Sequence, residues 1–108
     1  MANMTFSKAF TKQERYIRTT KRYFRCDEIP KTRCGVIIVT SNQDLETEQW
    51  TTTKMEVEFH LTGQYVDVPL LDPTCDILPR RRRSMAWKNA TMIAQAFCEK
   101  YINQTNTQ

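Results

Sequence analysis

Four consecutive arginines, Arg80, Arg81, Arg82 and Arg83, come directly before the most clearly amphipathic segment of the chain, and Lys88 follows within that segment. The free N–H groups and the dipole at a helix N-terminus attract anions, and arginine adds planar donors that suit phosphate or carboxylate. Four such charges beside a positive helix end are costly unless a negative partner offsets them. The run predicts contact with nucleic-acid phosphates or with an acidic protein surface, and a solvated basic patch is the simpler alternative.

A second basic group recurs every three or four residues near the start of the chain. On a helix this spacing places its members on one side, next to Tyr16 and Tyr23. Aromatic rings beside a basic track can stack on unpaired bases, although such tyrosines more often pack against a sheet. The spacing predicts a second phosphate-binding stripe, made of Arg15, Arg18, Arg22 and Arg25.

Charge is divided into three blocks along the chain. Residues 1–33 contain nine basic residues (Lys or Arg) and three acidic residues (Asp or Glu). Residues 34–79 contain one basic and eight acidic residues, and residues 80–108 contain six basic residues and one acidic residue. Two basic ends on an acidic middle indicate a charged partner, and blocks of opposite sign also suit association between copies. We therefore expect nucleic acid (RNA or DNA) or an acidic protein surface as the partner, and a homo-oligomer.

Residues that could support catalysis or bind a metal are few. His60 is the single histidine, and the chain has two glycines and no phosphate-binding loop motif. Glu56, Glu58 and His60 alternate and could ligate a metal, but a salt-bridged or solvated face is the simpler interpretation. The four cysteines lack Cys-x-x-Cys spacing and are expected to be reduced thiols, either buried or incidental. We expect a non-enzymatic protein without a cofactor or a metal site.

The first element that positions these residues is a predicted helix from Lys12 to Arg25. Thr11 and Glu14 have the spacing of a capping box, which marks a helix start. On a helical wheel the basic residues separate from an apolar and hydroxyl-bearing side, formed by Tyr16, Ile17, Thr20, Tyr23 and Phe24. Tyr, Ile and Thr also suit a strand, which remains the alternative for this segment.

Two strands and a hairpin are predicted in the middle of the chain. Residues 34–40 are apolar on both faces, which is typical of a central strand, and residues 54–61 alternate between apolar and polar. A two-residue turn at Thr62 and Gly63 would pair Phe59 with Val66. This register places Glu58 opposite Asp67 and predicts a cation over the acidic face, supplied by the basic helix, a second copy or a metal.

The last third of the chain is predicted to be a proline-containing loop followed by a helix. The loop covers residues 71–79 with Pro73 and Pro79, and Pro79 suits the first helical turn. One face of the helix is apolar, formed by Ala86, Ala90, Ile93, Ala94, Phe97 and Tyr101. The fold class predicted is α+β, in one domain of residues 1–108 with a polar tail at 103–108. An antiparallel sheet of three or more strands would carry an N-terminal and a C-terminal helix on one face.

The stretch 82–90, Arg-Arg-Ser-Met-Ala-Trp-Lys-Asn-Ala, resembles the basic start of the second helix in double-stranded-RNA-binding domains. There, a basic cluster at that helix start crosses a groove and binds phosphates. The resemblance covers about the last third of the chain, and the segment before the strands does not match the first helix of these domains. Ser84 and Trp87 replace basic positions of that pattern. A sheet with terminal helices in a chain of this size is also similar to small viral coat proteins.

These observations predict a small nucleic-acid-binding protein that contacts phosphates with little base specificity. The alternative is a structural, assembly or inhibitor protein, such as a viral component, whose basic segments dock on acidic protein surfaces or on its own copies. No apolar run approaches the roughly 20 residues that a membrane span needs. The start has no hydrophobic stretch of signal-peptide length, so an intracellular or intravirion location is expected.

Overall fold

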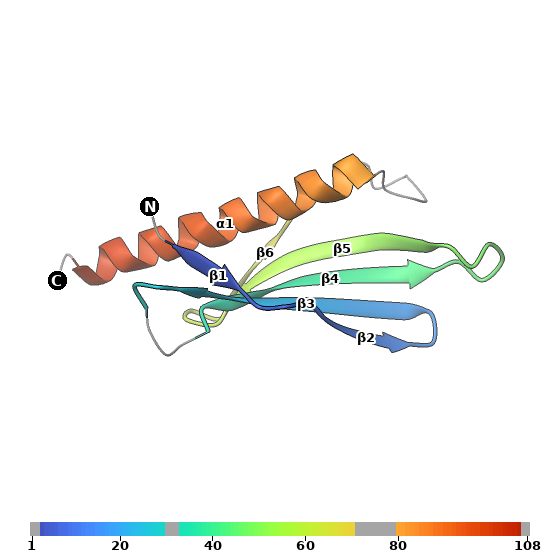
Figure 1. Ribbon diagram of the computed structural model, residues 1–108, viewed down its shortest axis with the longest axis horizontal. Coiled ribbons are helices and arrows are strands. Elements are labelled where there is room, and N and C mark those ends of the chain that lie inside the picture. Colours follow the sequence, from blue (N-terminus) through green and yellow to red (C-terminus); the bar gives the residue numbers. More distant parts are fainter. Residues whose placement is uncertain (1–2, 30–32, 71–79, 107–108) are drawn as a thin grey trace.

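The fold is a six-stranded antiparallel sheet with one long helix across one of its faces (Figure 1). The computed structural model describes residues 3–29, 33–70 and 80–106, and the side chains of residues 80–84 and 105–106 lie outside the description. The elements in chain order are β1 (Met4–Phe6), β2 (Phe10–Glu14), β3 (Ile17–Cys26), β4 (Gly35–Gln43), β5 (Trp50–Phe59), β6 (Gln64–Asp67) and α1 (Arg80–Asn106).

Strand β3 pairs with three other strands. On one side its first half pairs with β2 and its second half with β1, and on the other side it pairs with β4. The sheet continues from β4 to β5 and ends at β6. The prediction of a central strand at residues 34–40 is confirmed, because β4 lies between two strands and its first residues, Gly35, Val36 and Ile37, are buried.

The predicted N-terminal helix from Lys12 to Arg25 is wrong, and so is the packing of two helices on the sheet. That segment is the β2–β3 hairpin, with a two-residue turn at Arg15 and Tyr16. Its Ile, Thr and Tyr residues favour strands, and pairing on both sides of β3 outweighs a local helical pattern. In the part of the chain that the structure describes, α1 is the only helix.

The predicted hairpin after residue 54 forms, but in a different register. Phe59 pairs with Gln64 and Val57 with Val66, so four residues instead of two connect the strands. Gly63 has φ 77 and donates its N–H to the Phe59 carbonyl at 2.7 Å, which closes the longer loop. Because the register moves by two residues, each side chain stays on its predicted face.

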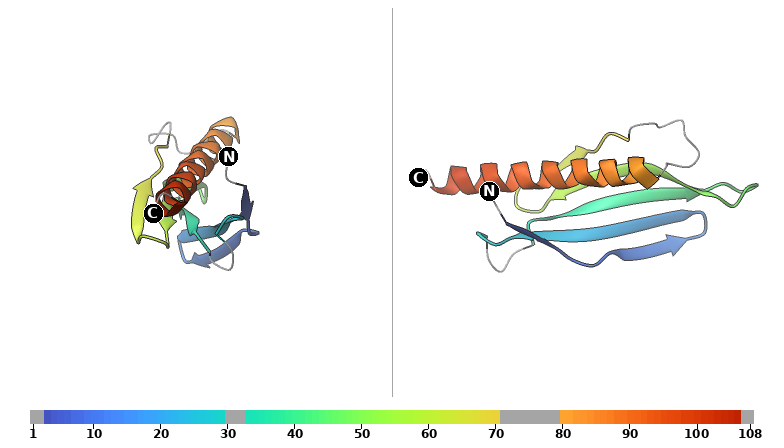
Figure 2. Two further views of the ribbon diagram at one scale, coloured as in Figure 1. Left: turned by 90° about the vertical axis from the view of Figure 1, so that its left-hand side faces the viewer. Right: turned by 45° about the horizontal axis from the view of Figure 1, so that its top comes forward.

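The core lies between α1 and the sheet face toward it. The predicted apolar face of the helix is confirmed, since Ala86, Ala90 and Ala94 are fully buried and Cys98 continues their row. Figure 2 shows α1 lying along one face of the sheet, and small buried side chains on the facing side of a helix allow a close approach. The sheet contributes large side chains to the same core, among them Phe24, Ile37, Val57 and Phe59.

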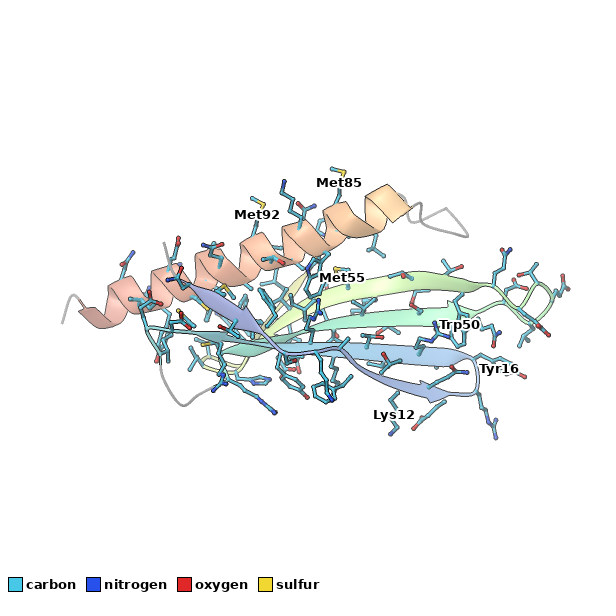
Figure 3. The ribbon with its side chains drawn as sticks, in the orientation of Figure 1. Lys12, Tyr16, Trp50, Met55, Met85 and Met92 are labelled. Carbon is cyan, nitrogen blue, oxygen red and sulfur yellow. The ribbon has the colours of Figure 1, made fainter. Side chains whose placement is uncertain are left out.

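The opposite face of the sheet is not covered by a described element. In Figure 3, Met85 and Met92 point away from the sheet on the outer side of α1, and Lys12 points away on the other side of the sheet. Because side chains alternate along a strand, each strand presents one set of residues to the helix and the next set to the uncovered face. We call this second surface the open face.

Candidate nucleic-acid interface

Two of the arginines predicted to bind phosphate lie on the sheet face toward α1. The Arg18 guanidinium is 4.1 Å from the centroid of the Trp50 ring, and the Arg22 guanidinium is 5.1 Å from that of Trp87. Arg22 Nε also donates to the Ser7 carbonyl at 2.9 Å. Both side chains therefore pack on aromatic rings of the protein itself.

The other two arginines of the predicted stripe point elsewhere. Arg15 is in the β2–β3 turn, with φ 51, and Arg25 is exposed on the open face. A strand separates residues that a helix would have aligned, so the four do not form one stripe. Their contact with phosphate stays a prediction.

The arginine run lies at the start of the C-terminal helix, as expected. Helix α1 begins at Arg80, so Arg81, Arg82 and Arg83 continue its first turn, and that turn contains no acidic residue. The structure describes the backbone of these four arginines but not their side chains, whereas Lys88 is exposed on α1. Contact of the four arginines and Lys88 with phosphate therefore stays a prediction.

The predicted proline loop at residues 71–79 falls outside the described residues, and Cys75 falls outside with it. The polar tail at 103–108 is described only as far as residue 106, where α1 ends. The helix thus includes the first part of the predicted tail.

The open face carries a basic and aromatic surface on its β1–β3 half. Lys8 lies 5.6 Å from the ring centroid of Phe10, and Arg33 lies 4.3 Å from that of Tyr23. The two rings meet edge to face, with centroids 6.1 Å apart. We define the basic strip as the five exposed cations around these rings: Lys8, Lys12, Lys21, Arg25 and Arg33.

Most charges of the basic strip have no carboxylate beside them. Lys12 is within 3.0 Å of Glu14, in a pair whose side chains are 79% and 71% exposed. Within the described residues, none of the other four cations lies within 4.0 Å of an acidic oxygen. An exposed pair such as Lys12–Glu14 contributes little stability and reorganises easily. Four of the five cations therefore have no acidic partner among the described residues.

The β5–β6 half of the open face is acidic. Glu56 faces Asp67 across the strands, whereas Glu58 faces Tyr65, so the predicted Glu58–Asp67 pairing is wrong by the same two-residue shift. Lys54 lies 3.4 Å from Glu56 and supplies a cation beside that carboxylate. The Tyr65 hydroxyl donates to Glu58 at 3.1 Å, which raises the pKa of Tyr65.

No group of three or more potential metal ligands comes together in the part of the chain that is described. Cys26, Cys34 and Cys98 are buried and unpaired, as predicted for three of the four cysteines. Burial raises the pKa of Cys26 to about 11 and that of Cys98 to about 12. Thiols with such pKa values are poor nucleophiles at neutral pH.

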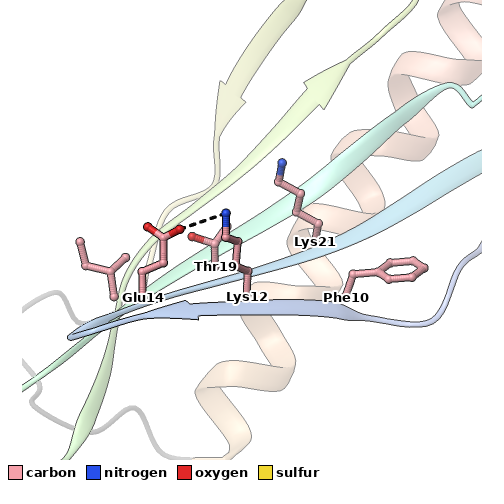
Figure 4. Close-up of a pocket in the computed structure, with 6 residues that line it drawn as sticks. Phe10, Lys12, Glu14, Thr19 and Lys21 are labelled. Atoms are coloured by element: carbon pink, nitrogen blue, oxygen red, sulfur yellow. Dashed lines mark ion pairs between the residues drawn. The ribbon is translucent and has the colours of Figure 1, made fainter.

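A shallow hollow of about 360 Å³ lies within the basic strip, over β2 and β3 (Figure 4). Three cross-strand pairs line it, with Phe10 opposite Lys21, Lys12 opposite Thr19 and Glu14 opposite Ile17. Thr19 is smaller than the aromatic ring at one end and the branched side chain at the other, which leaves the space in the middle.

Sequence reasoning missed four of the five cations in the strip, together with Phe10 and Thr19. The available signal was the strand preference of Ile17, Thr19 and Tyr23, since a strand places all odd-numbered residues from 17 to 25 on one side. The helical spacing of the arginines obscured this strand preference, because the segment is compatible with both a helix and a strand.

Comparison of the chain with protein-family models, curated proteins and solved structures finds no match. Among the described residues, α1 is too polar to form a membrane-spanning helix, and no other helix is present. The interpretation of the open face therefore depends on its own geometry.

Proposed function

We propose that this protein is a non-enzymatic nucleic-acid-binding protein whose main contact surface is the basic strip on the open face. The observation that carries the proposal is five exposed cations around two aromatic rings, four of them without a carboxylate partner among the described residues. Phosphates attract such a surface, and rings beside the cations offer stacking.

The acidic half of the open face limits the area over which a nucleic acid can bind. Glu56, Glu58 and Asp67 repel a polyanion, so a bound strand would follow β2 and β3 instead of crossing the sheet. The ten residues of β3 extend about 33 Å at the usual rise for a strand. This length suits several successive phosphates and gives little opportunity for base reading.

The arginine run at the start of α1 belongs to the proposal as a second contact. It begins the helix that covers the other side of the sheet, so one strand would have to pass around an edge to reach both surfaces. Lys88, exposed on α1, would extend this second contact. Each surface is expected to contribute its own salt-dependent affinity.

The experiment is a binding titration with two variants of equal net charge. Lys21→Gln removes one charge from the basic strip, and Lys100→Gln removes one exposed charge from α1. Affinity for labelled RNA and DNA is measured by fluorescence anisotropy over a range of salt concentrations. The strip variant should reduce the magnitude of the negative slope of log K against log salt by about 1, while the control variant should leave it almost unchanged.

Two results would overturn the proposal. Wild-type protein without affinity for RNA or DNA at low salt removes nucleic acid as the partner. Equal losses in the two variants would show that net charge alone matters, and that the basic strip has no special role.

A second candidate function, that of an assembly protein, is supported by a separate observation. Strand β6 is an edge strand whose four residues are all exposed, and Met85 and Met92 are exposed on the outer side of α1. Edge strands and apolar helix faces are common contacts between copies. Light scattering separates the candidates, because a stable oligomer that ignores added nucleic acid favours assembly.

A further inference from the structure

The hollow within the basic strip combines two cations, one carboxylate and an aromatic ring in a small space. Lys12 and Lys21 lie at its rim, Glu14 lies beside Lys12, and Phe10 closes one end. A simple anion would meet the Glu14 carboxylate as well as the lysines. A ligand that carries both negative charge and hydrogen-bond donors suits this mixture better.

The Phe10 ring is fixed and still accessible. Tyr23 meets it edge to face at 6.1 Å, and Lys8 lies 5.6 Å from its centroid. The Phe10 side chain nevertheless remains 47% exposed. A flat ring that is held in place but open on part of its surface is suited to stacking with another flat ring.

The size of the hollow limits the ligand. Its volume of about 360 Å³ is at the low end of the range for small-molecule sites, roughly 300–1,000 Å³. A single nucleotide is of this size, whereas a base pair stacked inside a duplex cannot enter. Only an unpaired nucleotide presents its ring face and its polar edge together.

From these features we propose that the hollow binds one unpaired base of a single-stranded nucleic acid, a refinement that rests on the proposed function. The base stacks on Phe10, and Glu14 accepts a hydrogen bond from an amino or imino group on the base edge. Lys12 and Lys21 contact the phosphates on either side of that nucleotide. Single strands therefore bind more tightly than a duplex of the same sequence.

The test fills the hollow without changing charge. Thr19→Ile adds apolar bulk at its centre, and isoleucine is at least as favourable as threonine in a strand. Thr11→Ile is the matched control, because Thr11 is exposed on the other face of the same hairpin. Phe10→Leu is a second variant that keeps an apolar side chain but removes the aromatic ring. Circular dichroism verifies that each variant is folded.

The probes are oligonucleotides of about 12 nucleotides, used as single strands and as duplexes, in RNA and in DNA. Wild-type protein should prefer the single strand by about tenfold, and both Thr19→Ile and Phe10→Leu should remove most of that preference. Their duplex affinity should equal that of wild type, and Thr11→Ile should behave as wild type throughout.

The outcomes separate this inference from the proposed function. Equal affinity of wild type for single strands and duplexes overturns the base-binding hollow and leaves phosphate binding intact. The base-binding hollow is also overturned if Thr19→Ile loses equal affinity for the single strand and the duplex. It is overturned as well if Thr19→Ile and Phe10→Leu both keep the wild-type preference for the single strand. An absence of binding to every probe at low salt overturns the hollow and the proposed function together.

Discussion

Phe97 of α1 stacks on Phe59 of β5, with ring centroids 3.8 Å apart and an angle of 18° between the ring planes. Phe59 is 2% exposed, and its ring also meets Phe24 of β3 edge to face. The stack therefore joins the helix to two strands. The neighbouring small residues of α1 bring the helix close enough for this contact, since Ala90 and Ala94 are fully buried.

Replacing Phe97 with alanine should weaken the attachment of the helix. Because Phe97 is only partly buried, we expect a loss of about 2 kcal/mol in the free energy of unfolding, below the range for fully buried phenylalanines. Met92→Ala is the control, because Met92 is 59% exposed on the outer side of the same helix. Urea denaturation followed by circular dichroism measures both. Equally small losses of unfolding free energy in Phe97→Ala and Met92→Ala would show that the ring stack does not hold α1 on the sheet.

Gly35 is expected to tolerate no side chain. A Cβ at this position would collide with the backbone carbonyl of Glu58 and lie 2.6 Å from the end of the Phe24 ring. Since neither neighbour can move away easily inside the sheet, Gly35→Ala should cost more than about 3 kcal/mol. Gly63→Ala is the comparison, because its Cβ would meet nothing within 4 Å and only the φ of 77 opposes it. That variant should lose about 1 kcal/mol. Similar losses in the two variants would contradict the close approach at Gly35.

The parts of the fold with one consistent pattern could be predicted from the sequence. The apolar residues 35–39 have no polar face to expose, so only a central strand suits them, and the row from Ala86 to Ala94 fits a helix alone. Residues 12–25 satisfy two patterns at once. Residues 17–25 form a strand because they pair with β1, β2 and β4, and a local sequence pattern does not reveal such pairing.

The candidate site could be predicted only in part for the same reason. The sequence showed the excess of basic residues in residues 1–33, and Arg25 was among the residues predicted to bind phosphate. Arg33, however, reaches the strip because its segment folds beside Tyr23, and Lys8 lies next to Phe10, which joins the strip because β2 pairs with β3. The hollow depends on which residue of β2 faces Thr19, and that is decided by the length of the turn between the two strands.

Lys21 and Arg22 are neighbours in sequence, and we expect their substitutions to have different effects. Arg22→Ala removes the contact with Trp87 and the hydrogen bond to Ser7, so stability should fall by about 1 kcal/mol with little change in nucleic-acid affinity. Lys21→Ala removes an exposed charge from the basic strip, so affinity should fall at unchanged stability. Thermal unfolding and anisotropy titrations on both variants provide the test. The same changes in stability and affinity in both variants would mean that the two faces of β3 are not functionally distinct.

The buried thiol of Cys98 predicts a loss of stability at high pH. Burial, followed by the nearby Cys34 and Cys26, raises the pKa of Cys98 from 9.0 to about 12. The folded state therefore retains a proton that the unfolded state releases above pH 9, so the free energy of unfolding falls as pH rises from 9 toward 12. Below pH 9 this group causes no pH dependence.

Urea denaturation under reducing conditions, at pH values below and above 9, measures this effect. In Cys98→Ala the decline above pH 9 should be shallower than in wild type, because all other titrating groups are shared. A decline of the same steepness in both proteins would show that Cys98 does not contribute to it.

The arginine run predicts opposite effects on stability and on binding. Arg80, Arg81, Arg82 and Arg83 lie at the positive end of the α1 dipole, and the first turn contains no acid that would offset them. Replacing all four with glutamine should therefore raise the free energy of unfolding at low salt by about 1 kcal/mol. If the run contacts phosphates, the same substitution should reduce the slope of log K against log salt by up to about 3. Denaturation at low and high salt, together with anisotropy titrations, measures both quantities. A loss of stability in the variant would mean that carboxylates of the same molecule already neutralise these arginines, and the reason for expecting an external anion there would disappear.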